Sequence, residues 1–252
     1  MTDASRGPSS ILVNVELPDP APLSSTLVDV LSSLRVVLLG WFAVPEQTSP
    51  AQARDQFGDE TQDTLDTVGR RFEAEGGEVT TRLVFTGNKL DTLTRVSTEE
   101  NCDAVLVPGT MDALRRVLVP LRGLDNVDQI APFVADLCRE ATAMVTLLHV
   151  VEEEETETSA RADVLKPAAA RMRDLGLDPS LFELDALTSD DPAAAIVDRA
   201  EAYDLVVLGE TKPSVQEILF GTVPERIVKT ADVPIIVVRH RDENVDAAEQ
   251  LL

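Results

Sequence analysis

The chain has few basic residues for its size, and this scarcity excludes one broad class of function. Its 252 residues include 45 Asp and Glu but only 22 Lys and Arg, which gives a formal net charge of −23. Nucleic-acid-binding proteins need a basic face for phosphate contacts, so no nucleic-acid partner is expected. Only four of the basic residues are lysines. We predict a cytoplasmic, halophilic protein, because molar salt shortens the Debye length to about 3 Å and screens the self-repulsion of such a chain.

Cysteines and long apolar runs are also scarce. Cys102 and Cys138 are the only cysteines, both lie in apolar runs, and neither belongs to a CxxC motif. Buried reduced thiols are therefore expected in place of a disulfide or a metal site. No apolar stretch approaches the ~20 residues that cross a bilayer, and residues 1–10 are polar, unlike a signal peptide. We expect no direct membrane insertion.

Signatures of catalysis are missing as well. The motifs GxSxG, HExxH and GxxxxGK[ST] do not occur, and neither cysteine has a histidine near it in the sequence. His149 lies within an apolar run with no acid or nucleophile beside it, which favours a structural role. The acidic residues 152–155 are interpreted as a solvated loop. No enzymatic activity, no catalytic residue and no metal site are expected.

What the sequence does contain is a regular alternation of strand-like apolar runs and amphipathic helical stretches. Hydrophobic residues make up 44% of the chain, and its length suggests two modest domains. The first half has four strand-like runs, at 11–15, 35–44, 79–85 and 104–107. The second half has five, at 117–120, 144–151, 181–186, 205–208 and 235–238. This order predicts parallel strands joined by crossover helices in an α/β fold.

The two halves resemble each other in sequence. The segment CDAVLVPGT at 102–110 parallels YDLVVLGET at 203–211, which indicates a tandem repeat. The repeat is unequal, because residues 110–115 are too few for the dozen or more that a parallel crossover needs. The first half should therefore stop at its fourth strand. The predicted organisation is a disordered N-terminus at 1–10, a degenerate domain at 11–114, a full domain at 115–241 and an acidic tail at 242–252.

The stretch LVVLGETKPSVQEILFGTVPERIVKTADVPIIVVR at 205–239 resembles the C-terminal signature of the universal stress protein (Usp) family. Further landmarks of that family match in order at 117–120, 147–150 and 191–196. The resemblance covers 115–240 closely and 11–109 more loosely, as in tandem haloarchaeal members with a degenerate first domain. It implies two Rossmann-like, doubly wound parallel sheets of strand order 3-2-1-4-5, the first truncated to about four strands.

The resemblance also implies a nucleotide site in the second half. Nucleotide-binding members carry Gly-x2-Gly-x9-Gly-(Ser/Thr), in which backbone N–H groups at a helix start hold the phosphates. Gly209 matches the first glycine, Lys212 stands at the second, and Gly221-Thr222 supplies the last pair one residue early. Together with Thr211 these residues are the implied phosphate contacts. Thr222 also fits a Thr-x-x-Glu capping box, which explains it without a ligand.

The strand that ends at Pro120 carries the other part of the implied site. Nucleotide-binding members place an Asp just after this strand, where it meets the adenosine, whereas this chain has Leu121-Arg122-Gly123. Val119 and Arg122 are predicted to border the nucleoside, with Arg122 favouring an anionic ligand. A solvated surface arginine is the alternative for Arg122. The expected ligand is ATP or AMP, with Mg²⁺ as a further source of positive charge.

Two functions remain open at this point. One is a nucleotide-binding regulatory protein of the Usp family, favoured by Gly209 and Gly221-Thr222. The other is a nucleotide-free interaction module that regulates a partner such as an amino-acid or cation transporter, favoured by the missing Asp and the missing second glycine. The apolar run at 233–238 is expected at a sheet edge, where the family often forms a homodimer contact. A homodimer through that strand is predicted.

Overall fold

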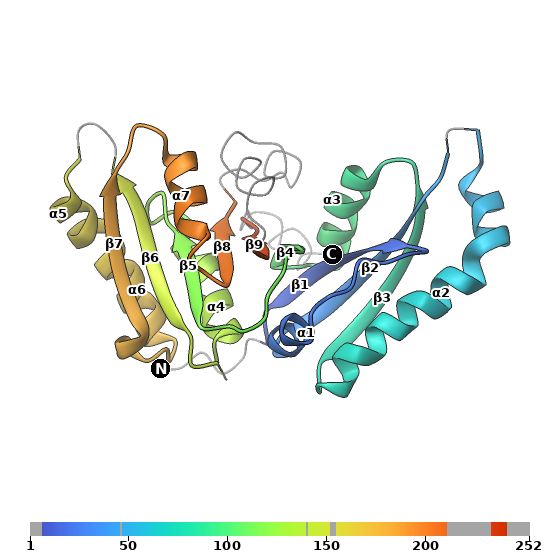
Figure 1. Cartoon of the computed structure of the whole chain (residues 1–252), viewed down its shortest axis with the longest axis horizontal. Coiled ribbons are helices and arrows are strands. Elements are labelled where there is room, and N and C mark those ends of the chain that lie inside the picture. The colour runs from blue at the N-terminus through green and yellow to red at the C-terminus, as the bar shows by residue number, and fades with distance from the viewer. Residues whose placement is uncertain (1–6, 46, 140, 152–154, 211–232, 241–252) are drawn as a thin grey trace, which may run out of the picture.

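In the computed structural model, which describes residues 7–45, 47–139, 141–151, 155–210 and 233–240, the strands form one continuous sheet with helices on both faces (Figure 1). The nine strands follow the order β3-β2-β1-β4-β9-β8-β5-β6-β7. The largest core cluster lies under α1, α2, α4 and α6, and two smaller clusters lie under α3 and α7 on the opposite face. The expected α/β class is confirmed.

The first half of the chain forms a parallel sheet of four strands in the order β3-β2-β1-β4. Its elements are β1 (Ser10–Leu17), α1 (Ser25–Leu31), β2 (Arg35–Ala43), α2 (Pro50–Ala74), β3 (Glu78–Thr86), α3 (Lys89–Glu99) and β4 (Ala104–Val107). The short link that follows β4 holds no further strand, as its length predicted.

The second half has five parallel strands in the order β7-β6-β5-β8-β9, which is the predicted order 3-2-1-4-5. Its first elements are β5 (Arg116–Pro120), α4 (Val127–Leu137), β6 (Met144–Val151), α5 (Glu157–Ala160), η1 (Arg161–Leu165) and α6 (Lys166–Asp174). Then follow η2 (Pro179–Leu181), β7 (Phe182–Thr188), α7 (Pro192–Ala200), β8 (Leu205–Gly209) and β9 (Ile235–Val238).

Local sequence explains where several helices begin and end. The side chains of Ser24, Ser49, Asn88 and Asp191 each accept a backbone N–H from the first turn of the helix that follows, as N-caps do. Prolines at the first position of α2 and α7 strengthen two of these starts. Gly176, two residues beyond α6, has φ +100°, a conformation that favours glycine at a helix C-terminus.

The prediction that 233–238 forms a sheet edge is wrong. β9 lies between β8, which it pairs in parallel, and β4, which it pairs antiparallel from Ala104↔Val238 to Val107↔Ile235 (Figure 1). The physical reason is the missing fifth strand of the first half, which leaves the outer edge of β4 without a partner of its own. β9 of the same chain takes that edge. Its backbone is therefore not available for the homodimer contact that the sequence suggested.

The aligned aspartates of the two halves perform the same task. Asp103, just before β4, accepts hydrogen bonds from the Ser10 N–H at 2.8 Å and the Ser10 hydroxyl at 3.0 Å, at the start of β1. Asp204, just before β8, accepts hydrogen bonds from the N–H groups of Arg115 and Arg116, at the start of β5. Each carboxylate thus joins the fourth strand of its half to the first.

The last two residues of the predicted disordered N-terminus pack against the rest of the protein. Ser9 and Ser10 fall within the expected disordered segment 1–10, yet both are buried. The Ser9 N–H and hydroxyl donate to Asp136 of α4 at 2.9 and 2.7 Å. This bond joins the first half of the chain to a helix of the second. Burial opposes ionisation of Asp136, but the hydrogen bonds from Ser9 and the nearby Arg139 outweigh it and lower the pKa of the carboxyl.

Asp136→Asn should therefore destabilise the protein in a pH-dependent way. At pH 7 we expect the free energy of unfolding to fall by about 1.5–3 kcal/mol, since hydrogen bonds to a charged group are lost. A lowered folded-state pKa stabilises above the unfolded value of about 3.9 and loses that stabilisation as pH falls. The difference in the free energy of unfolding between the parent and Asp136→Asn should accordingly shrink toward pH 3 in denaturant titrations. Asp128→Asn, whose exposed carboxylate on the same helix pairs with Arg171, should cost less than about 1 kcal/mol; equal losses would contradict the prediction.

The two cysteines are free and buried, as expected. Burial raises the pKa of the Cys102 thiol to about 11 and that of the Cys138 thiol to about 12. Both thiols are therefore protonated at neutral pH and act as small apolar side chains. Within the described ranges, no helix is both long and apolar enough to cross a membrane.

Candidate functional site

The strands of the second half place the candidate site at the carboxyl ends of β5 and β8. These two strands are neighbours and run parallel, with Val117 opposite Leu205 and Leu118 opposite Val206. The chain leaves β5 toward β6 on one side, and it leaves β8 toward β9 on the other (Figure 1). Such a point, where the winding reverses, is where open parallel sheets bind ligands.

Gly209, at the end of β8, allows α4 to approach the site. A Cβ at this position would lie 2.7 Å from Ile130 Cδ1 and 3.3 Å from the Asn126 Cβ, so a side chain would push against the first turns of α4. The Asn126 amide donates to the backbone carbonyl of Glu210 at 2.6 Å. The positively polarised N-terminus of α4 is thereby fixed beside the end of β8. Gly209 thus has a packing role in addition to any contact with a ligand.

Arg122 lies two residues beyond β5 and is exposed. Its guanidinium forms no hydrogen bond or ion pair with the described part of the chain. Its exposed side chain leaves a permanent positive charge in the loop between β5 and α4, with donors suited to an anionic oxygen.

The other predicted site residues are distributed differently. Val119 belongs to β5 and is 0% exposed within the largest core cluster, so its side chain offers no surface to a ligand. Thr211, Lys212, Gly221 and Thr222 lie outside the residues that the structure describes. The structure therefore brings Arg122 and Gly209 to the ends of neighbouring strands.

Glu210 is a buried acid that the sequence did not single out. It follows β8, is 2% exposed, and accepts the backbone N–H of His240 at 2.8 Å. Its own N–H donates to the carbonyl of Val238 at 2.8 Å. An acid directly after a strand is ordinarily solvated, so residue type alone gave no signal. Here it joins the ends of β8 and β9.

His149 is buried as a structural histidine would be, but the prediction that no acid accompanies it is wrong. The ring is buried in β6, with Nδ1 2.8 Å from the carbonyl oxygen of Leu121 and Nε2 2.9 Å from a carboxylate oxygen of Glu155. Glu155 was predicted to be part of a solvated acidic run. In the structure it is the partner of His149, whose other ring nitrogen contacts Leu121, the residue next to Arg122.

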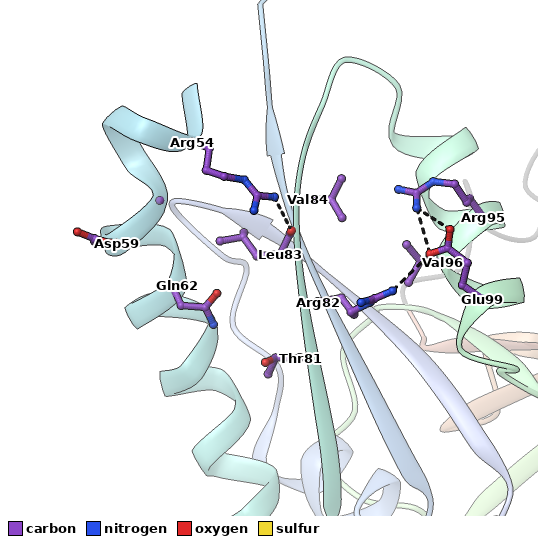
Figure 2. A pocket seen from close by; sticks show the side chains of 11 residues that line it. Arg54, Asp59, Gln62, Thr81, Arg82, Leu83, Val84, Arg95, Val96 and Glu99 are labelled. Atoms are coloured by element: carbon purple, nitrogen blue, oxygen red, sulfur yellow. Dashed lines mark hydrogen bonds and ion pairs between the residues drawn. The ribbon is translucent and has the colours of Figure 1, made fainter. Parts of the chain in front are cut away.

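A hollow of about 660 Å³ lies far from this site, along the free edge of β3 (Figure 2). Helices α2 and α3 flank it. Arg54 donates to the carbonyl of Leu83 at 3.4 Å, and both Arg82 and Arg95 contact Glu99. Its arginines are thus already occupied by neighbouring groups. No three of the described His, Cys, Asp and Glu residues are grouped so as to hold a metal ion.

The strand order defines a doubly wound α/β protein whose candidate site lies where the winding of the sheet reverses. The profile of the universal stress protein family matches residues 113–239. The chain belongs to the universal stress protein family.

Solved structures that cover almost the whole chain agree on the fold. A universal stress protein from Archaeoglobus fulgidus DSM 4304 has 14% identity and a TM-score of 0.65, covering 93% of this chain and 97% of that one. A Pseudomonas aeruginosa PAO1 protein of unknown function has 13% identity and a TM-score of 0.56, covering 97% and 96%. The Archaeoglobus fulgidus universal stress protein in complex with dAMP has 22% identity and a TM-score of 0.40, covering 51% and 100%. No curated protein matches the sequence.

Proposed function

We propose that this universal stress protein is a regulatory protein that binds an adenine nucleotide, AMP or ATP, at the carboxyl ends of β5 and β8. The observation that carries the proposal is the exposed, unpartnered side chain of Arg122 in the loop between β5 and α4, at the point where the sheet reverses. In this reading the ligand is a signal that changes how the protein meets its partners, and it is not a substrate.

The charges around the site support an anionic ligand. Arg122 carries a permanent positive charge and has no described carboxylate partner. The N-terminal end of α4 adds the partial positive charge of a helix start, and Mg²⁺ accompanying ATP would add more. The loop with Thr211, Lys212, Gly221 and Thr222 is proposed to hold the phosphates, through its family resemblance. The expected neighbour Val119 contributes backbone only, because its side chain is buried.

The second candidate is a nucleotide-free module that docks on a partner, such as a transporter. The observations that favour it are the absence of an Asp directly after the strand that ends at Pro120, and Lys212 at the position of the second glycine. A homodimer stays a prediction for either candidate. It must use a surface other than the backbone of β9, which is paired on both sides.

Calorimetric titration of AMP and of Mg-ATP at about 2 M KCl, where repulsion is screened, tests the proposal. We expect micromolar binding that weakens about 10- to 100-fold in Arg122→Ala, the loss typical of a hydrogen bond between charged groups. Arg122 supports no described contact, so this variant should fold normally. Gly221→Asp combined with Thr222→Glu should abolish binding by placing negative charge in the proposed phosphate loop.

Arg171→Ala is the matched control, because this exposed arginine forms only a surface ion pair with Asp128. It should bind as the parent does. No heat with either nucleotide, in a folded protein, would contradict the nucleotide proposal and favour the docking module. Binding that Arg122→Ala leaves unchanged would place the ligand elsewhere.

A further inference from the structure

The ring of His149 lies between two hydrogen-bond acceptors. The Leu121 carbonyl oxygen, 2.8 Å from Nδ1, can only accept, so Nδ1 must carry a proton. The Glu155 carboxylate, 2.9 Å from Nε2, also accepts when it is ionised. Both bonds therefore form together only when the His149–Glu155 pair holds one proton more than a neutral imidazole beside an ionised carboxylate. Beside an ionised Glu155, either neutral tautomer of His149 leaves one acceptor facing a ring lone pair.

These two bonds hold the segment that carries Arg122. The Leu121 N–H donates to the Leu148 carbonyl at 2.8 Å, and the Leu121 carbonyl accepts from His149. Both backbone groups of Leu121 are thus tied to β6, and its side chain is buried. Arg122 is the next residue. Glu155 lies two residues before α5, so the His149–Glu155 pair also joins the start of α5 to the end of β5.

Glu155 is the charged residue that contacts the His149 ring, at 2.9 Å. On the elements that pack around the ring, the other charged residues are Glu157 of α5, Arg161 and Asp163 of η1, Glu183 and Asp185 of β7, Arg116 of β5, and Arg122 and Asp125 of the loop after β5. Arg161 donates to the Leu184 carbonyl, and Asp185 pairs with Arg199 of α7. Glu183 bonds Thr146, while Glu157, Asp163, Arg122 and Asp125 are exposed. His149 itself is 5% exposed, and the side chain of Glu155 is 30% exposed.

We propose that His149 and Glu155 form a proton-dependent clasp that fixes the Leu121–Arg122 segment and makes anion binding at the β5/β8 site depend on pH. The consequence for binding rests on the proposed function, whereas the clasp itself does not. With the extra proton, Arg122 is held beside the site. When pH rises and the proton leaves, the Glu155 carboxylate or the Leu121 carbonyl faces a lone pair, the segment loosens, and affinity for the anionic ligand falls.

Glu155→Gln keeps the contact with the His149 ring but removes its dependence on the extra proton. A glutamine amide can donate to Nε2 of a neutral ring that keeps its proton on Nδ1, so the clasp closes without the extra proton. Glu155→Ala removes the contact altogether. Glu157→Gln is the matched control, since it neutralises an exposed acid two residues away that has no contact with the ring.

The first measurement is AMP affinity between about pH 6 and 9 for the parent and the three variants. Ionisation of AMP itself changes the affinity of all four proteins equally, so differences between their pH profiles come from the protein. We expect the parent to lose about tenfold more affinity than Glu155→Gln as pH rises, a coupling of ordinary size. Glu157→Gln should follow the parent, and Glu155→Ala should be weak at every pH. Identical pH profiles for the parent and Glu155→Gln would overturn the proposal.

The second measurement, ¹⁵N chemical shifts of the His149 ring, does not need a ligand. In the pH range where the parent binds AMP most tightly, we expect both nitrogens protonated in the parent and a neutral ring protonated on Nδ1 in Glu155→Gln. A parent ring that is neutral in that range, with its proton on Nε2, would overturn the clasp. If no nucleotide binds at any pH while the ring behaves as expected, the proposed function fails and the clasp stands.

Discussion

Gly109→Ala should lower the free energy of unfolding by about 2–3 kcal/mol, the cost of forcing extra volume into a closely packed site. A Cβ at Gly109 would lie 2.4 Å from the carbonyl carbon of Val233 and 2.5 Å from the nitrogen of Pro234. Both are backbone atoms just before β9, so no side chain can rotate away to relieve the clash. The variant should therefore separate the start of β9 from the end of β4, where the two halves of the sheet join.

Denaturant titrations in about 2 M KCl, followed by fluorescence of the single Trp41 and by far-UV circular dichroism, measure this effect. Trp41 lies on β2, so its fluorescence reports the first half. Gly58→Ala is the control: it lies within α2, its Cβ would meet only Arg54 Cγ at 3.6 Å, and it should stabilise by up to about 1 kcal/mol. A Gly109→Ala protein as stable as the parent would show that this junction can relax.

Arg239→Ala should have the next largest effect, about 2–3 kcal/mol, because hydrogen bonds from a charged group to buried acceptors are lost. The Arg239 guanidinium donates to the carbonyls of Ser97 and Cys102 at 2.8 and 3.3 Å, and to the Thr98 hydroxyl at 3.1 Å. These acceptors lie at the end of α3 and just before β4. Arg239 follows β9, so its side chain joins the last strand of the second half to the first half.

The same titrations test Arg239→Ala against Arg95→Ala. Arg95 is an exposed arginine of α3 that pairs with Glu99 at 2.8 Å, one turn further along the helix. Such surface pairs contribute about 0.3–0.5 kcal/mol, so the control should remain close to the parent. Similar losses of unfolding free energy for the two variants would mean that the contact of Arg239 with α3 stabilises the protein no more than a surface ion pair does.

The sequence by itself located the strands along the chain, and its resemblance to the Usp family implied their order within each half. Apolar runs located the strands, and the right number of strands followed from the short link at 110–115. Asp103 and Asp204 occupy the same position in the two aligned segments, so their equivalence could be seen in the sequence. These features depend on residues close together in the chain or on the period of one element, and both can be read from a sequence.

Only the tertiary structure decided which distant segments became neighbours. β9 pairs β4 although the two strands are well over one hundred residues apart, and Ser9 of the first half bonds Asp136 of the second. Alternation of apolar residues shows which face of a strand is buried, but it does not show which strand lies beside it. The position of β9 followed from an unsatisfied edge on β4, and an unpaired edge exists only once the sheet has formed.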